Sequence, residues 1–142
     1  MITIHINATG GRAVPHELVD RALREVLRGD GVAAAELSVT FVGDTEIARL
    51  HDHHLGSPRV TDVISFALHG EGEAPLGDVY IGHEQALRQA ADAGVAPDEE
   101  LARLAVHGAL HVLGYDHPEG SDRADSQMFA VQEEVVRRAV GS

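Results

Sequence analysis

The sequence predicts one domain of the α/β (α+β-like) class over residues 1–142, with one small mixed sheet of about four strands covered by about five helices. Three observations support this expectation. A length of 142 residues favours a single hydrophobic core. An apolar content of 44% supplies the side chains for such a core. Segments that alternate like strands come mainly early in the chain and segments with helical spacing come mainly late, so the helices can cover one sheet.

Four elements are predicted in the first part of the chain. The N-terminal residues MITIHI alternate and are rich in Ile and Thr, as in a strand. Leu18, Ala22 and Val26 recur at four-residue spacing, which is typical of an amphipathic helix. A later segment opens with Asp44 and Thr45, either of which is expected to cap a helix. The predicted elements are a strand over 1–6, a helix over 15–28, a strand over 36–43 and a helix over 44–56.

The second part of the chain is predicted to hold two further strands and three further helices. Pro97 suits the first turn of a helix, and the acidic residues that follow it lie at the positive end of the helix dipole. Apolar side chains then cover nearly every face as far as Leu113, so this helix is expected to be buried. The predicted elements are strands over 62–69 and 78–82 and helices over 83–94, 97–115 and 121–140.

Composition argues against several classes of protein. The formal net charge of −12 disfavours a general nucleic-acid binder, because attraction to phosphates supplies most non-specific affinity. The chain has no cysteine, so neither disulfides nor thiolate metal sites can form. The sequence has no signal-peptide pattern and no apolar run of about 20 residues, and the chain is therefore expected to be cytoplasmic.

The segment HGALHVLGYDH contains three histidines, His107, His111 and His117. The first two are four residues apart, so they point the same way from a helix. Gly114 lets the helix stop and the chain reverse, which can return His117 to the same point. Three neutral imidazoles around one point form a site for one Zn²⁺ per chain, with a fourth position open to water as in catalytic zinc sites. Asp116 is the candidate to orient one of these ligands.

The same spacing matches the metal-binding frame of the metzincin proteases. In that frame a glutamate follows the first histidine and acts as the general base. This chain has Gly108 at that position, and glycine cannot accept a proton. A metallopeptidase is therefore the least favoured function, and a metal-dependent hydrolase of another kind is expected.

The histidine segment also resembles the hallmark of the YbeY-type endoribonucleases, or rRNA maturation factors, which reads roughly HGxLHLxGYDH. The chain differs from that hallmark only by Val112 in place of leucine. The resemblance extends over about residues 36–136. Three further segments are similar to the family, namely TDVISF at 61–66, LGDVYI at 76–81 and MFAVQEEVV at 128–136.

This resemblance implies a single α/β domain with one catalytic Zn²⁺ held by His107, His111 and His117. It implies single-strand-specific cleavage of RNA, with roles in small-subunit rRNA maturation and ribosome quality control. The expected partners are therefore single-stranded RNA and the small ribosomal subunit or its precursors, with no membrane and no DNA.

One position departs from the family pattern. The family carries a Tyr-Arg pair before the TDVISF segment, and alignment without gaps puts that pair on His54 and Leu55. Leucine cannot bind a phosphate, so Arg59, four residues further on, is the candidate catalytic residue that takes over this contact. Asp62 and Asp78 match aspartates of the family and are candidates to line the cleft, or else they merely begin strands.

Two alternatives remain open from the sequence. The chain could be a ribosome-assembly or RNA-binding factor with a non-catalytic zinc site, which Leu55 and the acidic composition favour. The cluster HDHH at 51–54 could form a second metal site. We interpret it instead as the solvated face of a helix, because neighbouring residues on a helix diverge.

Overall fold

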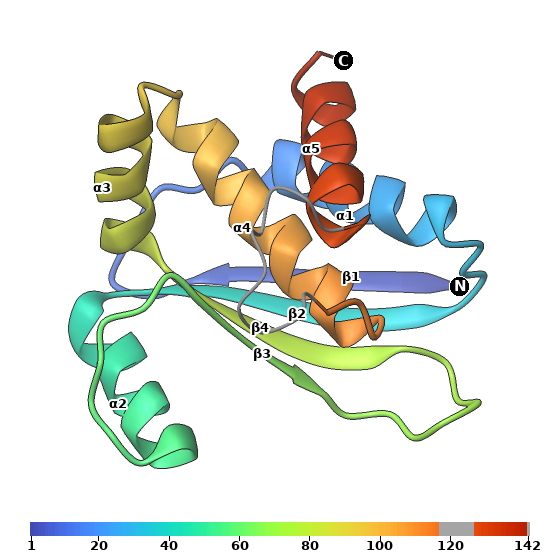
Figure 1. Ribbon diagram of the computed structural model, residues 1–142, viewed down its shortest axis with the longest axis horizontal. Coiled ribbons are helices and arrows are strands. Elements are labelled where there is room, and N and C mark those ends of the chain that lie inside the picture. The colour runs from blue at the N-terminus through green and yellow to red at the C-terminus, as the bar shows by residue number, and fades with distance from the viewer. Residues whose placement is uncertain (117–126, 142) are drawn as a thin grey trace.

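Four strands form one mixed sheet in the computed structural model, which describes residues 1–116 and 127–141 (Figure 1). The strands lie in the order β1-β2-β4-β3. The first three in this order run parallel, and β3 runs antiparallel to β4 at one edge of the sheet. Their bounds are β1 Ile2–Ala8, β2 Ala35–Val42, β3 Val63–Ala67 and β4 Leu76–Gly82. The predicted α/β class and mixed sheet are confirmed.

Within the described residues, five helices cover the sheet, with α1, α3, α4 and α5 on one face and α2 on the other (Figure 1). The helix α4 crosses the middle of its layer and contacts α1, α3, α5, β3 and β4. Because α4 is surrounded in this way, it is buried as predicted. The helices are α1 His16–Gly29, α2 Asp44–Leu55, α3 His83–Ala93, α4 Pro97–Val112 and α5 Gln127–Val140.

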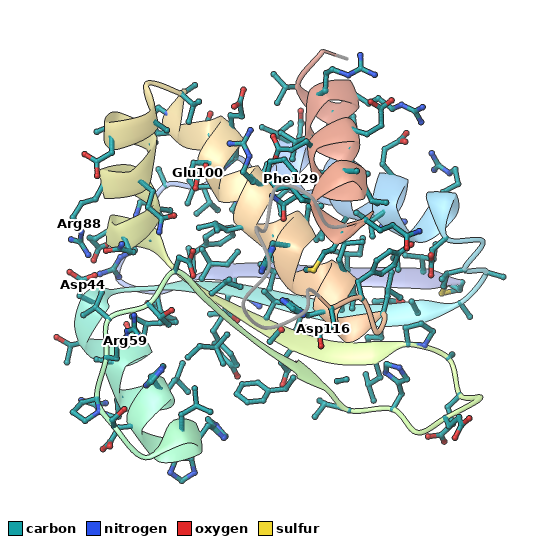
Figure 2. The ribbon with its side chains drawn as sticks, in the orientation of Figure 1. Asp44, Arg59, Arg88, Glu100, Asp116 and Phe129 are labelled. Atoms are coloured by element: carbon teal, nitrogen blue, oxygen red, sulfur yellow. The ribbon has the colours of Figure 1, made fainter. Side chains whose placement is uncertain are left out.

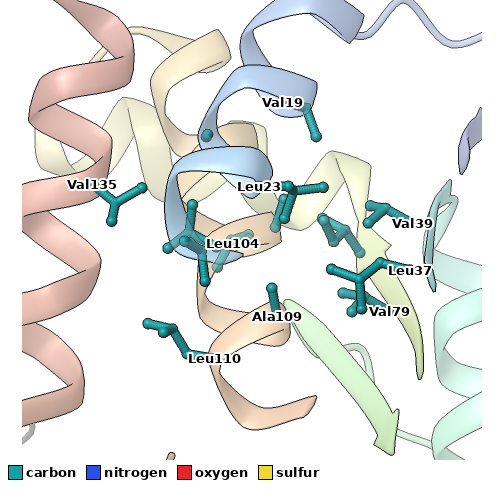
Figure 3. Close-up of a cluster of buried hydrophobic side chains, with 14 of the residues drawn as sticks. Val19, Leu23, Leu37, Val39, Val79, Leu104, Ala109, Leu110 and Val135 are labelled. Carbon is teal, nitrogen blue, oxygen red and sulfur yellow. The ribbon is translucent and has the colours of Figure 1, made fainter. Parts of the chain in front are cut away.

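The larger hydrophobic core lies between the sheet and the layer that contains α4 (Figure 3). Leu37 and Val39 of β2 and Val79 of β4 enter this core from the sheet, and Leu104 and Ala109 enter it from α4. Successive strand residues point to opposite faces of the sheet, and a second, smaller core lies on the other face, beneath α2. That core consists of Val42, Ile47 and Ile64, with Leu50, Phe66 and Tyr80 packed against it.

Two glycines allow α4 to lie very close to the sheet. A Cβ atom at Gly108 of α4 would collide with Val79 of β4. A Cβ atom at Gly77 of β4 would come within 2.6 Å of Val112 Cγ1. Carbon atoms pack at about 3.5–4.0 Å, so neither position accepts a side chain without displacing the helix. The place that holds a glutamate in metzincins therefore faces the sheet in this chain.

The two strands β3 and β4 differ in length from their predicted ranges, 62–69 and 78–82. The strand β3 ends at Ala67, because the next N–H of the partner strand, that of Leu76, donates its hydrogen bond to the imidazole Nδ1 of His69 and not to a main-chain oxygen. The strand β4 begins at Leu76, which pairs with Glu36 of β2. Asp78 thus lies inside β4 and does not begin it.

The helix ends also differ from the prediction. Gly43 occupies the N-cap of α2, and neither Asp44 nor Thr45 caps this helix. Asp44 instead accepts hydrogen bonds from Arg88 of α3, at 2.9 and 3.1 Å. The helix α4 ends at Val112, short of the predicted residue 115. The beginning of the last predicted helix, 121–126, lies outside the described residues.

Of the helices described, none is both long enough and apolar enough to cross a membrane.

Candidate metal centre

His107 and His111 bring their imidazoles together near the C-terminal end of α4. Their Nε2 atoms are 3.2 Å apart, and their ring centroids are 4.7 Å apart with an interplanar angle of 81°. The His107 side chain is buried, with 7% of the residue exposed, and His111 is half-buried at the edge of the helix layer. The two rings point the same way, as their four-residue spacing predicts.

A carbonyl oxygen holds the other nitrogen of each ring. His107 Nδ1 lies 2.8 Å from the side-chain Oε1 of Gln132, and His111 Nδ1 lies 3.1 Å from the main-chain oxygen of Tyr115. A carbonyl oxygen only accepts hydrogen bonds, so each Nδ1 carries the proton and donates. Both Nε2 atoms therefore present lone pairs, which is the usual arrangement of histidine ligands in metal sites.

Gly114 places the carbonyl that holds His111. This glycine has a φ of 97°, in the left-handed region, and it ends α4 in a Schellman turn. In this turn Tyr115 N donates to Leu110 O at 2.9 Å, and Gly114 N donates to His111 O at 3.0 Å. The reversed chain returns the Tyr115 carbonyl to the His111 ring. The helix stop predicted at Gly114 is confirmed, and it orients a candidate ligand.

The separation of the two Nε2 atoms suits a tetrahedral zinc ion. Lone pairs that face each other at 3.2 Å repel, unless a proton or a cation lies between them. Two nitrogens that each bind zinc at about 2.0–2.1 Å in tetrahedral geometry lie about 3.3 Å apart. The donor set of His107 and His111 therefore fits zinc.

The third predicted ligand, His117, lies outside the described residues. The described part of the chain alone contains no group of three His, Cys, Asp or Glu side chains able to hold a metal ion. One zinc ion bound by His107, His111 and His117 therefore stays a prediction.

The histidine pair opens into a cavity of about 620 Å³. The floor of this cavity is β3, the edge strand of the sheet, together with the residues just before it. One wall is α4, which contributes His107 and His111, and the other is the C-terminal end of α2. The α2 wall consists of His51, His54 and Leu55.

The interpretation of HDHH as a solvated helix face describes only part of this cluster. His51, which is half-buried, and His54, which is exposed, line the cavity. Asp52 and His53 are also exposed and are not among the described residues that line it. His51 Nδ1 donates to the Ser57 main-chain oxygen at 2.6 Å, and the His54 ring lies 4.4 Å from the ring of Phe66. The sequence contains a signal for this arrangement, because positions 47, 50, 51 and 54 share one helix face.

Arg59 lies in the exposed loop between α2 and β3, and Figure 2 shows it beside α2. Leu55 and Thr61, on either side of this loop, line the cavity, while Arg59 is not among the described lining residues. Its guanidinium makes no hydrogen bond or ion pair with the described part of the chain. The contact between Arg59 and a phosphate stays a prediction, and the side chain is available for it.

The three aspartates predicted near the site lie in three different places. Asp62 lines the cavity and accepts a hydrogen bond from Gln89 of α3 at 3.3 Å. Asp78 alternates with Val79, which faces α4, so Asp78 lies on the opposite face of the sheet and is not among the described lining residues. Asp116 is exposed just beyond the last turn of α4 (Figure 2), and its role in orienting a ligand stays a prediction.

Gln132 is a residue of the site that the sequence analysis missed. It lies on α5, it is only 6% exposed, and it contacts His107 across 25 positions of sequence. The signal in the sequence is a polar residue in an otherwise apolar stripe. The buried residues of α5 are Met128, Gln132, Val135, Val136 and Ala139.

Comparison with known proteins decides the family. The family model described as Endoribonuclease YbeY matches residues 6–140. The chain belongs to the endoribonuclease YbeY family. The resemblance of its histidine segment to this family is thereby confirmed.

Relatives named Endoribonuclease YbeY match most of the chain. The YbeY of Chloroflexus aggregans is 39% identical, over 98% of this chain and 96% of that protein. The YbeY of Pelotomaculum thermopropionicum is 43% identical, over 85% of this chain and 84% of that protein. The solution structure of TM1509 from Thermotoga maritima matches with a TM-score of 0.69 and 26% identity, over 98% of this chain and 90% of that one. The similarity to these proteins thus extends over most of the chain.

Proposed function

We propose that this chain is a zinc-dependent endoribonuclease that cleaves single-stranded RNA, and that it acts in small-subunit rRNA maturation and ribosome quality control. The observation that carries the proposal is the convergence of the His107 and His111 Nε2 atoms, 3.2 Å apart, in the wall of a cavity. Membership of the endoribonuclease YbeY family supports the reaction. His117 completes the ligand set in this proposal.

The residues around the cavity have separate tasks. A bound zinc ion would supply a Lewis acid and a water molecule of lowered pKa. His107 and His111 would hold it through their Nε2 atoms, because hydrogen bonds at Nδ1 prevent either ring from turning away. Arg59 binds a phosphate of the RNA from the loop beside the cavity, in place of the arginine that the family has at Leu55.

The preference for single-stranded RNA is supported by two rings in the cavity. His54 and Phe66 have centroids 4.4 Å apart and planes inclined at 51°, and both line the cavity. Bases of single-stranded RNA can unstack and lie against such rings, whereas bases inside a duplex remain stacked on each other. Unpaired RNA is therefore the substrate that this cavity suits best.

The test compares metal-loaded, metal-stripped and His111→Ala protein on single-stranded RNA, duplex RNA and casein. We expect only the metal-loaded wild-type protein to cleave, and only on single-stranded RNA. Elemental analysis should find one zinc ion per chain in the wild-type protein and none in the double variant His107→Ala/His111→Ala. Full zinc content in the double variant, or equal cleavage after metal removal, would contradict the proposal.

An RNA-binding assembly factor with a non-catalytic zinc site is the second candidate. The observation that favours it is Leu55, which is 67% exposed at the place where the family has an arginine. This candidate predicts RNA binding without cleavage in the same assay. A peptidase is disfavoured because a side chain at Gly108 would collide with Val79 in the sheet, and the casein sample tests that function directly.

A further inference from the structure

A chain of hydrogen bonds leads from the candidate ligand His107 to a half-buried ion pair. His107 Nδ1 donates to Gln132 Oε1 at 2.8 Å. Gln132 Nε2 donates to Glu133 Oε2 at 3.0 Å. Glu133 in turn accepts two hydrogen bonds from Arg103, from Nε at 2.8 Å and from a terminal nitrogen at 3.1 Å. The chain therefore connects α4 to α5 and returns to α4.

Arg103 is held firmly at the end of this chain. It lies one helical turn before His107, on the face of α4 that also carries His111. Besides Glu133, it donates to Glu100 at 2.8 Å and to Glu99 at 2.9 Å. Bidentate pairing of a guanidinium with a carboxylate is among the strongest hydrogen-bonded arrangements in proteins. The position of the Glu133 carboxylate is thus fixed from α4.

The charge of Glu133 determines which way the Gln132 amide faces. Burial alone would raise the pKa of the Glu133 carboxyl, but hydrogen bonds from Arg103 and Gln132 outweigh burial and hold that pKa below its ordinary value. An ionised carboxylate only accepts hydrogen bonds, so the amide must turn its NH₂ group toward Glu133. Its carbonyl oxygen then faces His107. The reverse orientation would put two acceptors against each other at Glu133.

We propose that Gln132 is a positioning residue of the metal site, which sets the Nδ1–H tautomer of His107 and so leaves the Nε2 lone pair for the metal, with Glu133 and Arg103 fixing the direction of the amide. The inference rests on the zinc site proposed above. It extends that site by three residues that bind neither metal nor substrate.

The tautomer is the direct observable, and it does not require metal. In metal-free protein, nitrogen-15 NMR of the imidazoles should show His107 protonated at Nδ1. Gln132→Leu removes the acceptor and should give a mixture of the two tautomers. Glu133→Gln preserves the volume but no longer dictates the amide direction, so it should also give a mixture. An Nε2–H tautomer at His107 in the wild-type protein, or an unchanged tautomer in both variants, would overturn the inference.

Zinc affinity is the second readout, measured by competition with a chromophoric chelator. Loss of a residue that orients a metal ligand usually weakens binding by about 10- to 100-fold, and we expect that loss for Gln132→Leu. The matched control is Glu134→Gln, one residue further along α5, whose carboxylate pairs with Arg137 and Arg138 at the surface. This control should bind zinc like the wild-type protein. Equal zinc affinity in Gln132→Leu and the control would also overturn the inference.

A swapped pair separates positioning from simple packing. In the double variant Gln132→Glu/Glu133→Gln, a carboxylate faces His107 Nδ1 and an amide NH₂ faces that carboxylate. We expect zinc affinity within a few-fold of wild type, although each residue has changed. If Gln132→Leu does not fold, the contrast between Glu133→Gln and the swapped pair still decides the matter, since equally weak zinc binding in both would contradict positioning.

The two proposals fail in different ways. Suppose that the wild-type protein binds no zinc, but His107 has the Nδ1–H tautomer and loses it in Gln132→Leu. The zinc proposal then fails, and the inference that Gln132 sets the tautomer of His107 stands. If zinc binds at one ion per chain and the tautomer does not respond to Gln132, the positioning inference fails alone.

Discussion

The two described imidazoles of the candidate metal centre are each oriented by a carbonyl oxygen, while the residues proposed to hold RNA lie on different elements. His107 and His111 are fixed from α5 and from the turn after α4. His54 and Arg59 instead belong to α2 and to the loop that follows it. Substitutions in the second group should therefore change RNA binding or cleavage and leave metal content unchanged.

Arg59 is predicted to contact the scissile phosphate or a neighbouring one. A charge-assisted hydrogen bond of this kind contributes about 1.5–3 kcal/mol. Arg59→Ala should therefore lower kcat/KM on single-stranded RNA by about 10- to 100-fold, with zinc content and Tm unchanged. Leu55→Arg should raise it, because this change restores the residue that the family has at that place. Unchanged cleavage in Arg59→Ala would show that the arginine has not been relocated.

His54 is predicted to stack against an RNA base together with Phe66. Stacking of a base on a ring contributes about 1–3 kcal/mol, so His54→Ala should weaken binding of single-stranded RNA by at least about fivefold. His16→Ala is the matched control, since His16 is an exposed histidine at the start of α1 and is not among the described residues that line the cavity. Fluorescence anisotropy with a short labelled RNA measures both variants. Equal affinities in the two variants would contradict the stacking role.

At the scale of elements, the position of α4 depends on its close approach to the sheet. Gly108→Ala puts a methyl group against Val79, and it should lower the free energy of unfolding by about 1–3 kcal/mol. Gly29→Ala is the control, because a Cβ atom at the end of α1 meets no atom within 4 Å. Thermal unfolding should show a lower Tm for the first variant and a Tm close to wild type for the second. A wild-type Tm in Gly108→Ala would mean that α4 can move away from β4 at little cost.

A second contact between elements makes stability depend on pH. Arg12, in the loop after β1, donates hydrogen bonds to both carboxylate oxygens of Glu84 in the first turn of α3, and these hold the Glu84 pKa at about 2. A carboxyl whose pKa is depressed on folding stabilises the protein above its unfolded pKa. That stabilisation is lost as the pH falls from about 4.5 toward 2. Since the pair is partly exposed, Glu84→Gln should cost about 1 kcal/mol at pH 7.

Urea unfolding at pH 7, 5 and 3 measures this effect. The difference between wild type and Glu84→Gln should be nearly constant from pH 7 to pH 5 and smaller at pH 3. Glu71→Gln, in the exposed loop before β4, should match the wild-type protein at every pH. A difference for Glu84→Gln that does not change with pH would mean that the ion pair is not its source.

At the scale of the whole molecule, local and non-local features differ in how well the sequence predicts them. The buried helix α4, the stop at Gly114 and the shared direction of His107 and His111 follow from periodicity and backbone chemistry within a few residues. The strand order β1-β2-β4-β3 depends on pairing between distant segments, and no local pattern encodes it. The same holds for Gln132, whose partner is 25 residues away, and for His51 and His54, whose importance depends on where β3 lies.

Charge is the other property of the whole molecule that bears on function, because a chain with a net charge of −12 must still hold RNA. In the described part of the chain, every arginine except Arg49 and Arg59 already has a hydrogen-bond or ion-pair partner within the protein. The described part of the chain therefore offers few unpaired cations for phosphate contacts, and we expect most of the affinity to come from contacts with bases.

The salt dependence of RNA binding tests this conclusion. About two phosphate contacts to a single strand predict a slope near −1.4 in a plot of log K against log salt concentration, since each contact contributes about −0.7. Anisotropy measured on His111→Ala, to prevent cleavage, between about 50 and 200 mM salt should give that shallow slope. Adding Arg59→Ala should make it shallower by about 0.7. A slope steeper than about −4 would mean that many cations bind the RNA backbone, and it would contradict recognition through bases in the cavity.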